Sequence, residues 1–171
     1  ATSSSPRYVT AFGNQLVCTA ATSGSGREIW ISDGTSAGTT MVKEIFPGVT
    51  GSEPAYLAAI HDSVYFSAND GVAGYELWKT NGTAAGTVLV GDLRPGPFGS
   101  DPSDFKFIDG TMYFTADDGV TGYEPWTIDL VPVLDVVLSP TSIAENSGFH
   151  ATPTSVGAPA SASESSAARA R

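Results

Sequence analysis

The sequence predicts an all-β protein built from four-stranded antiparallel repeats of 48 residues, and three observations support this. Gly and Pro make up 30 of the 171 residues, so turns are dense and the segments between them are short. Those segments are rich in β-branched and aromatic residues, which favour strands. A Gly-x-Glu-x-Trp pattern also recurs at residues 26–30, 74–78 and 122–126, with no insertion or deletion between copies.

The second repeat shows how each strand is delimited. His61-Asp62 marks the first turn and Asn69-Asp70-Gly71 the second, while Asn81-Gly82 is a dipeptide that accepts the positive φ angles of a tight hairpin. An Arg94-Pro95-Gly96 turn closes the unit. The expected strands between these turns span residues 55–60, 63–68, 75–80 and 87–93.

The copies match closely enough to be one structural unit. Residues 35–54 share 10 of 20 positions with residues 83–102, and residues 54–81 share 12 of 28 with residues 102–129. Four short strands in this length correspond to one propeller blade, which takes about 40 to 50 residues. A parallel β-helix and a chain of small β-sandwiches are the alternatives. The coils of a β-helix repeat faster, however, and a sandwich of about 100 residues would span two repeats without making both copies alike.

The repeats define the expected domain organisation. Units at 6–53, 54–101 and 102–129 place eleven strands, or two and three-quarter blades, within residues 6–131. Known propellers close with about four blades or more. We therefore expect either further repeats of a longer chain or self-association to complete the ring, and we favour a chain that is a fragment.

The repeat pattern ends before residue 133. Residues 133–149 resemble the opening strands of Calx-β or cadherin-like sandwich modules of bacterial surface proteins, which implies the truncated start of a second module. Residues 150–171 are expected to be disordered, because 12 of residues 151–171 are Ala or Ser and no apolar alternation remains.

A family resemblance rests on residues 76–87, which read Glu-Leu-Trp-Lys-Thr-Asn-Gly-Thr-Ala-Ala-Gly-Thr. This segment resembles the ELWxxDGT repeat of large bacterial secreted or surface proteins. The first copy, at residues 28–39, differs by Ile29 in place of Leu, and the third carries Pro125 there and loses the pattern after Asp129. The resemblance implies a β-repeat architecture and an extracellular or cell-surface location, and it names no reaction.

Composition argues against several functional classes. A formal charge of −10 with only eight scattered Lys and Arg argues against nucleic acid as a partner. No apolar run approaches the roughly 18 residues of a membrane span. The single Cys18 aligns with Phe66 and Phe114 and is expected to be a buried apolar residue. His61 aligns with turn positions, so no Ser-His-Asp set can be assembled and no catalytic residue is predicted.

The repeated acids and aromatics have a structural and a functional interpretation. Glu28, Glu76 and Glu124 could ring a channel and bind a cation, but we favour a structural role in which they accept backbone hydrogen bonds. The aromatic residues at matching positions could stack on sugars, but we favour packing between blades. These aromatic residues are Trp30, Trp78, Trp126, Tyr75 and Tyr123.

The loops predict an acidic rim. The loop between the second and third strands and the loop between units emerge on the same face of a propeller, and both are rich in carboxylates. The candidate ligand-binding residues are Glu53, Asp70, Asp101, Asp117 and Asp118. Ca²⁺ is a candidate ion at Asp70, Asp117 and Asp118, because it prefers oxygen ligands. An Asp-Gly pair is also a common turn sequence.

These observations lead to a functional hypothesis with two alternatives. The main hypothesis is a non-catalytic extracellular module that serves adhesion or binds a glycan or protein partner. One alternative is a fragment of a propeller-type carbohydrate-active enzyme that uses carboxylates. The other is a structural stalk stiffened by calcium.

Overall fold

The computed structural model of the 171-residue chain describes residues 4–130 and 136–140. Within them the regular structure is entirely β, in three four-stranded antiparallel sheets. The first sheet contains β1 (Arg7–Phe12), β2 (Gln15–Thr22), β3 (Gly26–Ser32) and β4 (Thr40–Lys43). The second contains β5 (Ala55–Ile60), β6 (Ser63–Asn69), β7 (Tyr75–Thr80) and β8 (Val88–Gly91). The third contains β9 (Ser103–Ile108), β10 (Thr111–Asp117), β11 (Tyr123–Leu130) and β12 (Val136–Pro140).

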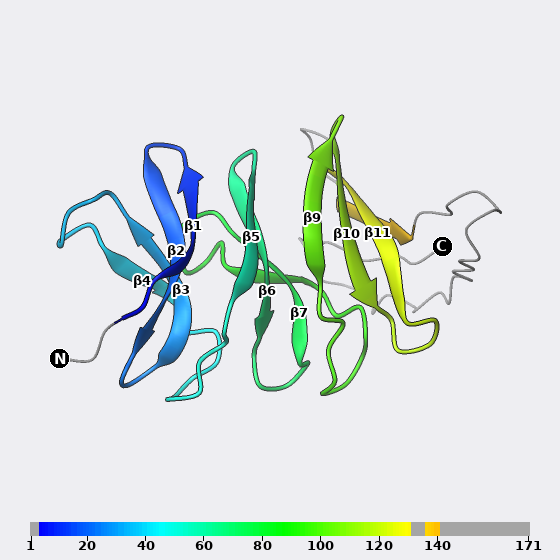
Figure 1. Ribbon diagram of the computed structural model, residues 1–171, viewed down its shortest axis with the longest axis horizontal. Helices are drawn as coiled ribbons and strands as arrows, with labels where there is room; N and C mark the ends of the chain where they lie inside the picture. The colour runs from blue at the N-terminus through cyan, green and yellow to red at the C-terminus, as the bar shows by residue number, and fades with distance from the viewer. Residues whose placement is uncertain (1–3, 131–135, 141–171) are drawn as a thin grey trace.

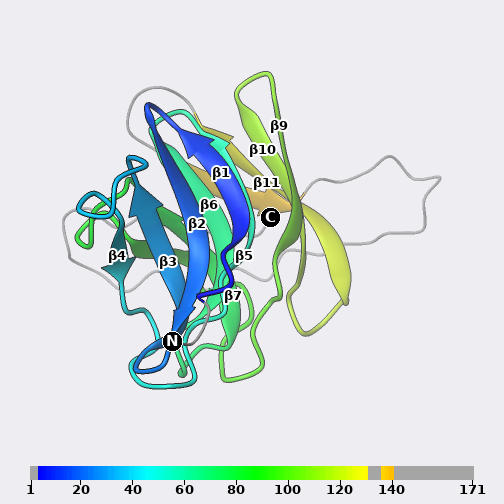
Figure 2. The ribbon, with the colours of Figure 1, turned by 60° about the vertical axis from the view of Figure 1, so that its left-hand side comes forward.

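The sheets follow the interval seen in the sequence. Strands β1, β5 and β9 begin at residues 7, 55 and 103, which are 48 residues apart. The predicted all-β fold of four-stranded antiparallel units is therefore confirmed. The three sheets stand side by side in chain order, and their first strands are neighbours, β1 beside β5 and β5 beside β9 (Figures 1 and 2). This is the arrangement of incomplete propeller blades, whose first strands surround a common axis. None of the described residues forms a helix long and apolar enough to span a membrane.

The third sheet takes its fourth strand from beyond the repeat sequence. Residues 136–140 pair with β11, with Thr127 opposite Ser139, and so occupy the outer position that β4 and β8 hold in their sheets. The eleven strands expected within residues 6–131 are present as β1 to β11, and β12 lies in the segment 133–149 that was expected to open a second module. The Val-Val-Leu run of β12 covers the backbone edge that β11 would otherwise expose. The remainder of the expected sandwich segment 133–149 and the whole of the expected tail 150–171 lie outside the described residues.

The repeated Asn/Asp-Gly-Thr sequence builds the loop between the third and fourth strands. The Asn81 side-chain oxygen accepts hydrogen bonds from the Thr83 backbone N–H at 3.1 Å and the Thr83 hydroxyl at 2.7 Å. Asp33 does the same toward Thr35 in the first repeat, at 2.9 and 2.8 Å. A Cβ at Gly86 would overlap the Asn81 side chain, so this loop requires glycine at that position. The geometry of this turn therefore explains why the Asn/Asp-Gly-Thr sequence recurs in the first two repeats.

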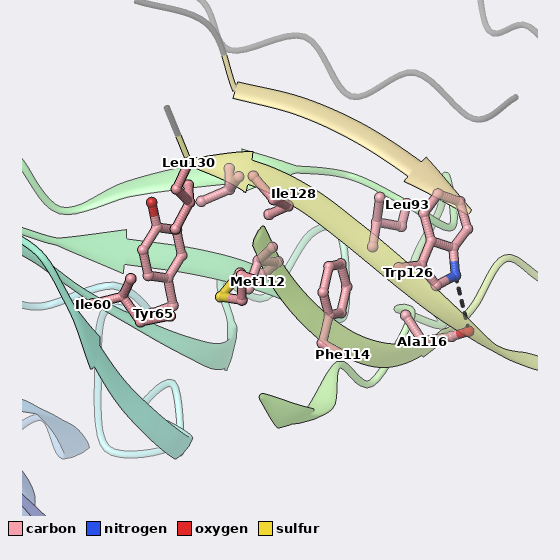
Figure 3. Close-up of a cluster of buried hydrophobic side chains, with 11 residues drawn as sticks. Ile60, Tyr65, Leu93, Met112, Phe114, Ala116, Trp126, Ile128 and Leu130 are labelled. Carbon is pink, nitrogen blue, oxygen red and sulfur yellow. Dashed lines mark hydrogen bonds between the residues drawn. The ribbon is translucent and has the colours of Figure 1, made fainter. Parts of the chain in front are cut away.

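The hydrophobic core lies between the sheets and not within any one of them. Each interface takes one face of a sheet and the opposite face of the next, as strand alternation allows. The first interface contains Val17, Ile29, Val42, Ile45, Val64, Phe66, Ala68 and Trp78. The second contains Ile60, Tyr65, Leu77, Val90, Leu93, Met112, Phe114, Ala116, Trp126, Ile128 and Leu130 (Figure 3).

The tryptophans and the single cysteine follow this packing. Trp78 and Trp126 are buried at the two interfaces, and the Trp126 indole donates a hydrogen bond to the Ala116 carbonyl at 3.3 Å (Figure 3). Trp30, at the same position of the first sheet, is half-buried. Cys18 is buried, and burial raises the pKa of its thiol. A buried thiol with a raised pKa is a poor nucleophile.

The outer face of the third sheet is open among the described residues. Ile108 and Tyr113 expose 56% and 38% of their surfaces, whereas Ile60 and Tyr65, at the same positions one repeat earlier, expose 5% and 4%. Ile60 and Tyr65 are covered by the third sheet. The difference in exposed fraction therefore shows how much surface a neighbouring sheet buries on this face of the repeat.

Candidate functional site

The repeated glutamates Glu28 and Glu76 lie inside the structure and bind the loop that leads to the next repeat. Glu28 is fully buried and accepts hydrogen bonds from the backbone N–H groups of Ile45, Phe46 and Ser52, at 3.0 to 3.1 Å. The Ser52 hydroxyl donates a fourth bond to it. These bonds fasten β3 to the segment that connects the first and second sheets.

Glu76 repeats this arrangement between the second and third sheets. It accepts hydrogen bonds from Leu93 N–H at 3.0 Å, from Arg94 N–H at 3.4 Å and from the Ser100 hydroxyl at 2.6 Å. Burial raises the pKa of Glu76 to about 7, although its hydrogen bonds act in the opposite direction. Burial also raises the pKa of Glu28. Both carboxylates are therefore enclosed by protein and do not form an open cation site.

Glu124 differs from the other two glutamates. It is 6% exposed, and its Oε2 atom has no hydrogen-bond partner among the described residues. The donors of the other two glutamates come 17, 18 and 24 residues later in the chain. The same offsets from Glu124 lead to residues 141, 142 and 148, which lie outside the described residues.

The three aspartates that were calcium candidates are engaged in their own turns or in an ion pair. Asp70 Oδ1 accepts hydrogen bonds from Val72 N–H and Ala73 N–H at 2.8 Å. Asp118 Oδ1 accepts the corresponding two bonds at 2.8 Å, and these help to lower its pKa against the effect of burial. Asp117 forms an ion pair with Arg94 at 2.6 Å. Within residues 4–130, no three Asp, Glu, His or Cys side chains converge on a point where they could hold a metal ion.

The remaining two acidic candidates, Glu53 and Asp101, meet at an open cavity of about 590 Å³ between the second and third repeats. Tyrosines account for much of the rest of its wall, and the short side chains of Ala55, Ser67 and Ser103 leave room between them. The tyrosines are Tyr56, Tyr75 and Tyr123. Tyr56 and Tyr123 are 50% and 56% exposed, so their rings are accessible to a ligand. We call this feature the tyrosine cavity.

The polar groups of the tyrosine cavity are arranged around Tyr75. Burial raises the pKa of the Tyr75 phenol, and the negative charges of Glu53 and Asp101 raise it further. The Tyr123 hydroxyl donates a hydrogen bond to Asp101 Oδ2 at 3.4 Å. Arg27, which does not line the cavity, forms an ion pair with Glu53 at 3.5 Å. Both carboxylates therefore act on a phenol of the same cavity.

The backbone at the tyrosine cavity has an unusual conformation that recurs in each repeat, with positive φ angles also at Ser5, Tyr8 and Asp104. Glu53, Tyr56 and Asp101 have φ angles of 45°, 58° and 46°, in the left-handed region that non-glycine residues seldom adopt. Tyr56 also falls where the register between β5 and β6 shifts, as in a β-bulge. Bulges redirect a side chain and are enriched near binding sites. Here the bulge accompanies the placement of the Tyr56 ring on the cavity wall.

The structure thus brings together two of the five predicted acids and both predicted tyrosines, and it leaves Asp70, Asp117 and Asp118 off the cavity wall. Tyr56 was not predicted, because strand alternation assigns it no special role and a bulge leaves little trace in a sequence. His61, at the turn after β5, packs its ring edge-on against Phe107 with centroids 5.0 Å apart. Comparisons with family models, with curated proteins and with solved structures found no match to this chain.

Proposed function

We propose that the chain is a non-catalytic glycan-binding module and that the tyrosine cavity is its binding site. One observation carries the proposal: three tyrosines and two carboxylates line a single open cavity. Aromatic rings pack against the apolar faces of sugar rings, and carboxylates accept hydrogen bonds from sugar hydroxyls. A cavity of about 590 Å³ is of the size that holds a small ligand.

The arrangement of the carboxylates favours binding over catalysis. Glycoside hydrolysis uses two carboxyl groups beside the bond that breaks, one of them kept protonated by a raised pKa. Glu76 has a pKa of about 7, but its oxygens are held by Leu93, Arg94 and Ser100, and it does not line the tyrosine cavity. An enzyme fragment is the alternative, and release of sugar from an oligosaccharide by the purified chain would support it.

An extracellular or cell-surface location and a role in adhesion form part of the proposal. They are motivated by the resemblance of residues 76–87 to ELWxxDGT repeats and by the acidic composition. Residues 26–129 hold 15 acidic and 5 basic side chains, so the charge of −10 belongs to the repeats. A calcium-stiffened stalk is less well supported, because Asp70 and Asp118 already bind their own turns.

We also propose a partner for the exposed outer face of the third sheet. A further repeat, or another copy of the chain, would cover Ile108 and Tyr113 as the third sheet covers Ile60 and Tyr65. Size measurement by light scattering over a range of concentrations tests whether copies of the chain associate. A strict monomer would count against closure by self-association.

Titration calorimetry against a panel of oligosaccharides tests glycan binding. We expect Tyr123→Ala to weaken binding about tenfold, the effect of losing one aromatic contact. Tyr113→Ala is the matched control, because Tyr113 is 38% exposed and lies outside the cavity. Equal losses in the two variants, or binding that neither variant changes, would contradict the proposed site.

A further inference from the structure

The tyrosine cavity carries an unbalanced negative charge. Its wall contains Glu53 and Asp101 but no Lys, Arg or His. Glu53 is offset by Arg27, whose guanidinium is 3.5 Å away. Asp101 receives only the neutral Tyr123 hydroxyl, at 3.4 Å, among the side-chain hydrogen bonds and ion pairs of the described residues. One carboxylate at the cavity is therefore not matched by a cation.

The charged groups just beyond the wall do not supply the missing charge. Arg94 and Asp117 both influence Tyr123, with opposite signs. They form an ion pair with each other at 2.6 Å, so their fields largely cancel at the cavity. The negative field of Asp101 persists at the phenols, where it contributes to the raised pKa values of Tyr75 and Tyr123.

The tyrosine rings favour the same kind of ligand as Asp101 does. The face of an aromatic ring carries partial negative charge and attracts an ammonium group within about 6 Å of its centre. Tyr56, Tyr75 and Tyr123 place three such rings around one cavity. A carboxylate beside aromatic rings is a combination that recognises an ammonium group, which donates three hydrogen bonds.

We propose that the tyrosine cavity selects glycans that carry a free amino group, and that Asp101 and the tyrosine rings hold the protonated amine. This inference rests on the proposed glycan binding and adds the chemical class of the ligand. N-acetylation removes the positive charge and leaves one N–H donor, so an acetylated sugar would leave Asp101 unpaired. We expect the free amine to bind at least about tenfold more tightly than its acetylated form.

Calorimetry with a matched pair of ligands tests the inference. The pair is a glucosamine oligomer and the N-acetylglucosamine oligomer of the same length, at about pH 6, where an amine is protonated. We expect the preference for the amine to shrink as ionic strength rises from about 0.05 to about 0.5 M. Asp101→Asn should reduce binding of the amine about tenfold and leave the acetylated oligomer unaffected.

Asp62→Asn is the control, because Asp62 is exposed at the β5–β6 turn and does not line the cavity. Thermal melting of each variant checks that it is folded. Equal binding of the two oligomers, or an Asp101→Asn variant that keeps the preference, would overturn amine selectivity while leaving glycan binding in place. If neither oligomer binds and the wider oligosaccharide panel also fails, the proposed function itself is wrong.

Discussion

Replacing Glu76 with Gln should change how the stability of the protein depends on pH. Glu76 is fully buried, and its folded-state pKa of about 7 lies above the ordinary value of 4.5. Because the folded chain holds this proton more tightly than the unfolded chain does, protonation stabilises the fold. That contribution is fully present below about pH 4.5 and is lost as the pH rises through about 7. At about 1.4 kcal/mol per pKa unit, the loss is on the order of 3 kcal/mol.

Urea denaturation at intervals from about pH 4.5 to about pH 7.5 measures this contribution as the free energy of unfolding. The wild-type value should fall with pH more steeply than that of Glu76→Gln, because glutamine has no proton to lose in this range. Glu28 shifts in the same direction and is present in both proteins, so the difference between them isolates Glu76. Glu44→Gln is the control, because it removes an exposed carboxylate and leaves Glu76 and its donors in place, so the steep fall with pH should remain. Parallel curves for Glu76→Gln and wild type would refute the argument and would mean that the three donors keep Glu76 ionised.

Three further predictions follow from the packing and the turns. Gly74→Ala should lower the free energy of unfolding, measured by thermal denaturation, by more than about 2 kcal/mol, because its Cβ would overlap the Gly99 backbone. Gly96→Ala should lower it by about 1 kcal/mol, because Gly96 has a positive φ angle but open space around it. Ile60→Ala should destabilise by about 2 to 4 kcal/mol and Ile108→Ala by less than about 1, and similar values would indicate that the outer face of the third sheet is covered in solution. Added Ca²⁺ and a chelator should give equal melting temperatures, since Asp70 is engaged in its turn; a rise with Ca²⁺ would show that the folded state binds the ion.

The architecture was predictable because the repeat sequence occurs three times in the chain. Each turn signal recurs at the same offset, so a chance Asn-Gly or Asp-Gly could be told from one that ends a strand. Strands β5 and β6 begin within one residue of the expected positions. The fourth strand of the third sheet was assigned to a separate sandwich module, because Val136–Pro140 lacks the repeat sequence. Its pairing with β11 depends on an edge that only the folded sheet offers.

The candidate site was predictable only in part, for a physical reason. Glu53 and Asp101 were placed correctly on loops between units, but nothing in the sequence separates them from the loop aspartates Asp70 and Asp118. What separates them is hydrogen bonding: the loop aspartates satisfy their own turns, whereas Glu53 and Asp101 face the cavity. That distinction depends on backbone angles, which repeat spacing does not encode.

The repeats also differ in a way that limits the number of binding sites. Arg27 occupies the position that Tyr75 and Tyr123 hold in the later repeats. Its guanidinium is buried and donates hydrogen bonds to the Ser5 carbonyl at 2.9 Å and to the Thr19 carbonyl and hydroxyl at 3.2 Å. It therefore fills, between the first and second repeats, the space that corresponds to the tyrosine cavity.

Arg27→Tyr should open this space and create a second binding site. The new wall would hold the introduced phenol beside Tyr75, with Glu53 released from its ion pair. Calorimetry with the glucosamine oligomer should then give about two sites per chain in place of one, at a cost in stability of about 1 to 3 kcal/mol from the lost hydrogen bonds of Arg27. Arg27→Lys keeps the cation near Glu53 and should remain at one site. A folded Arg27→Tyr variant with unchanged stoichiometry would show that residue 27 does not decide which space between repeats is open, and that the tyrosine cavity depends on features particular to the third repeat.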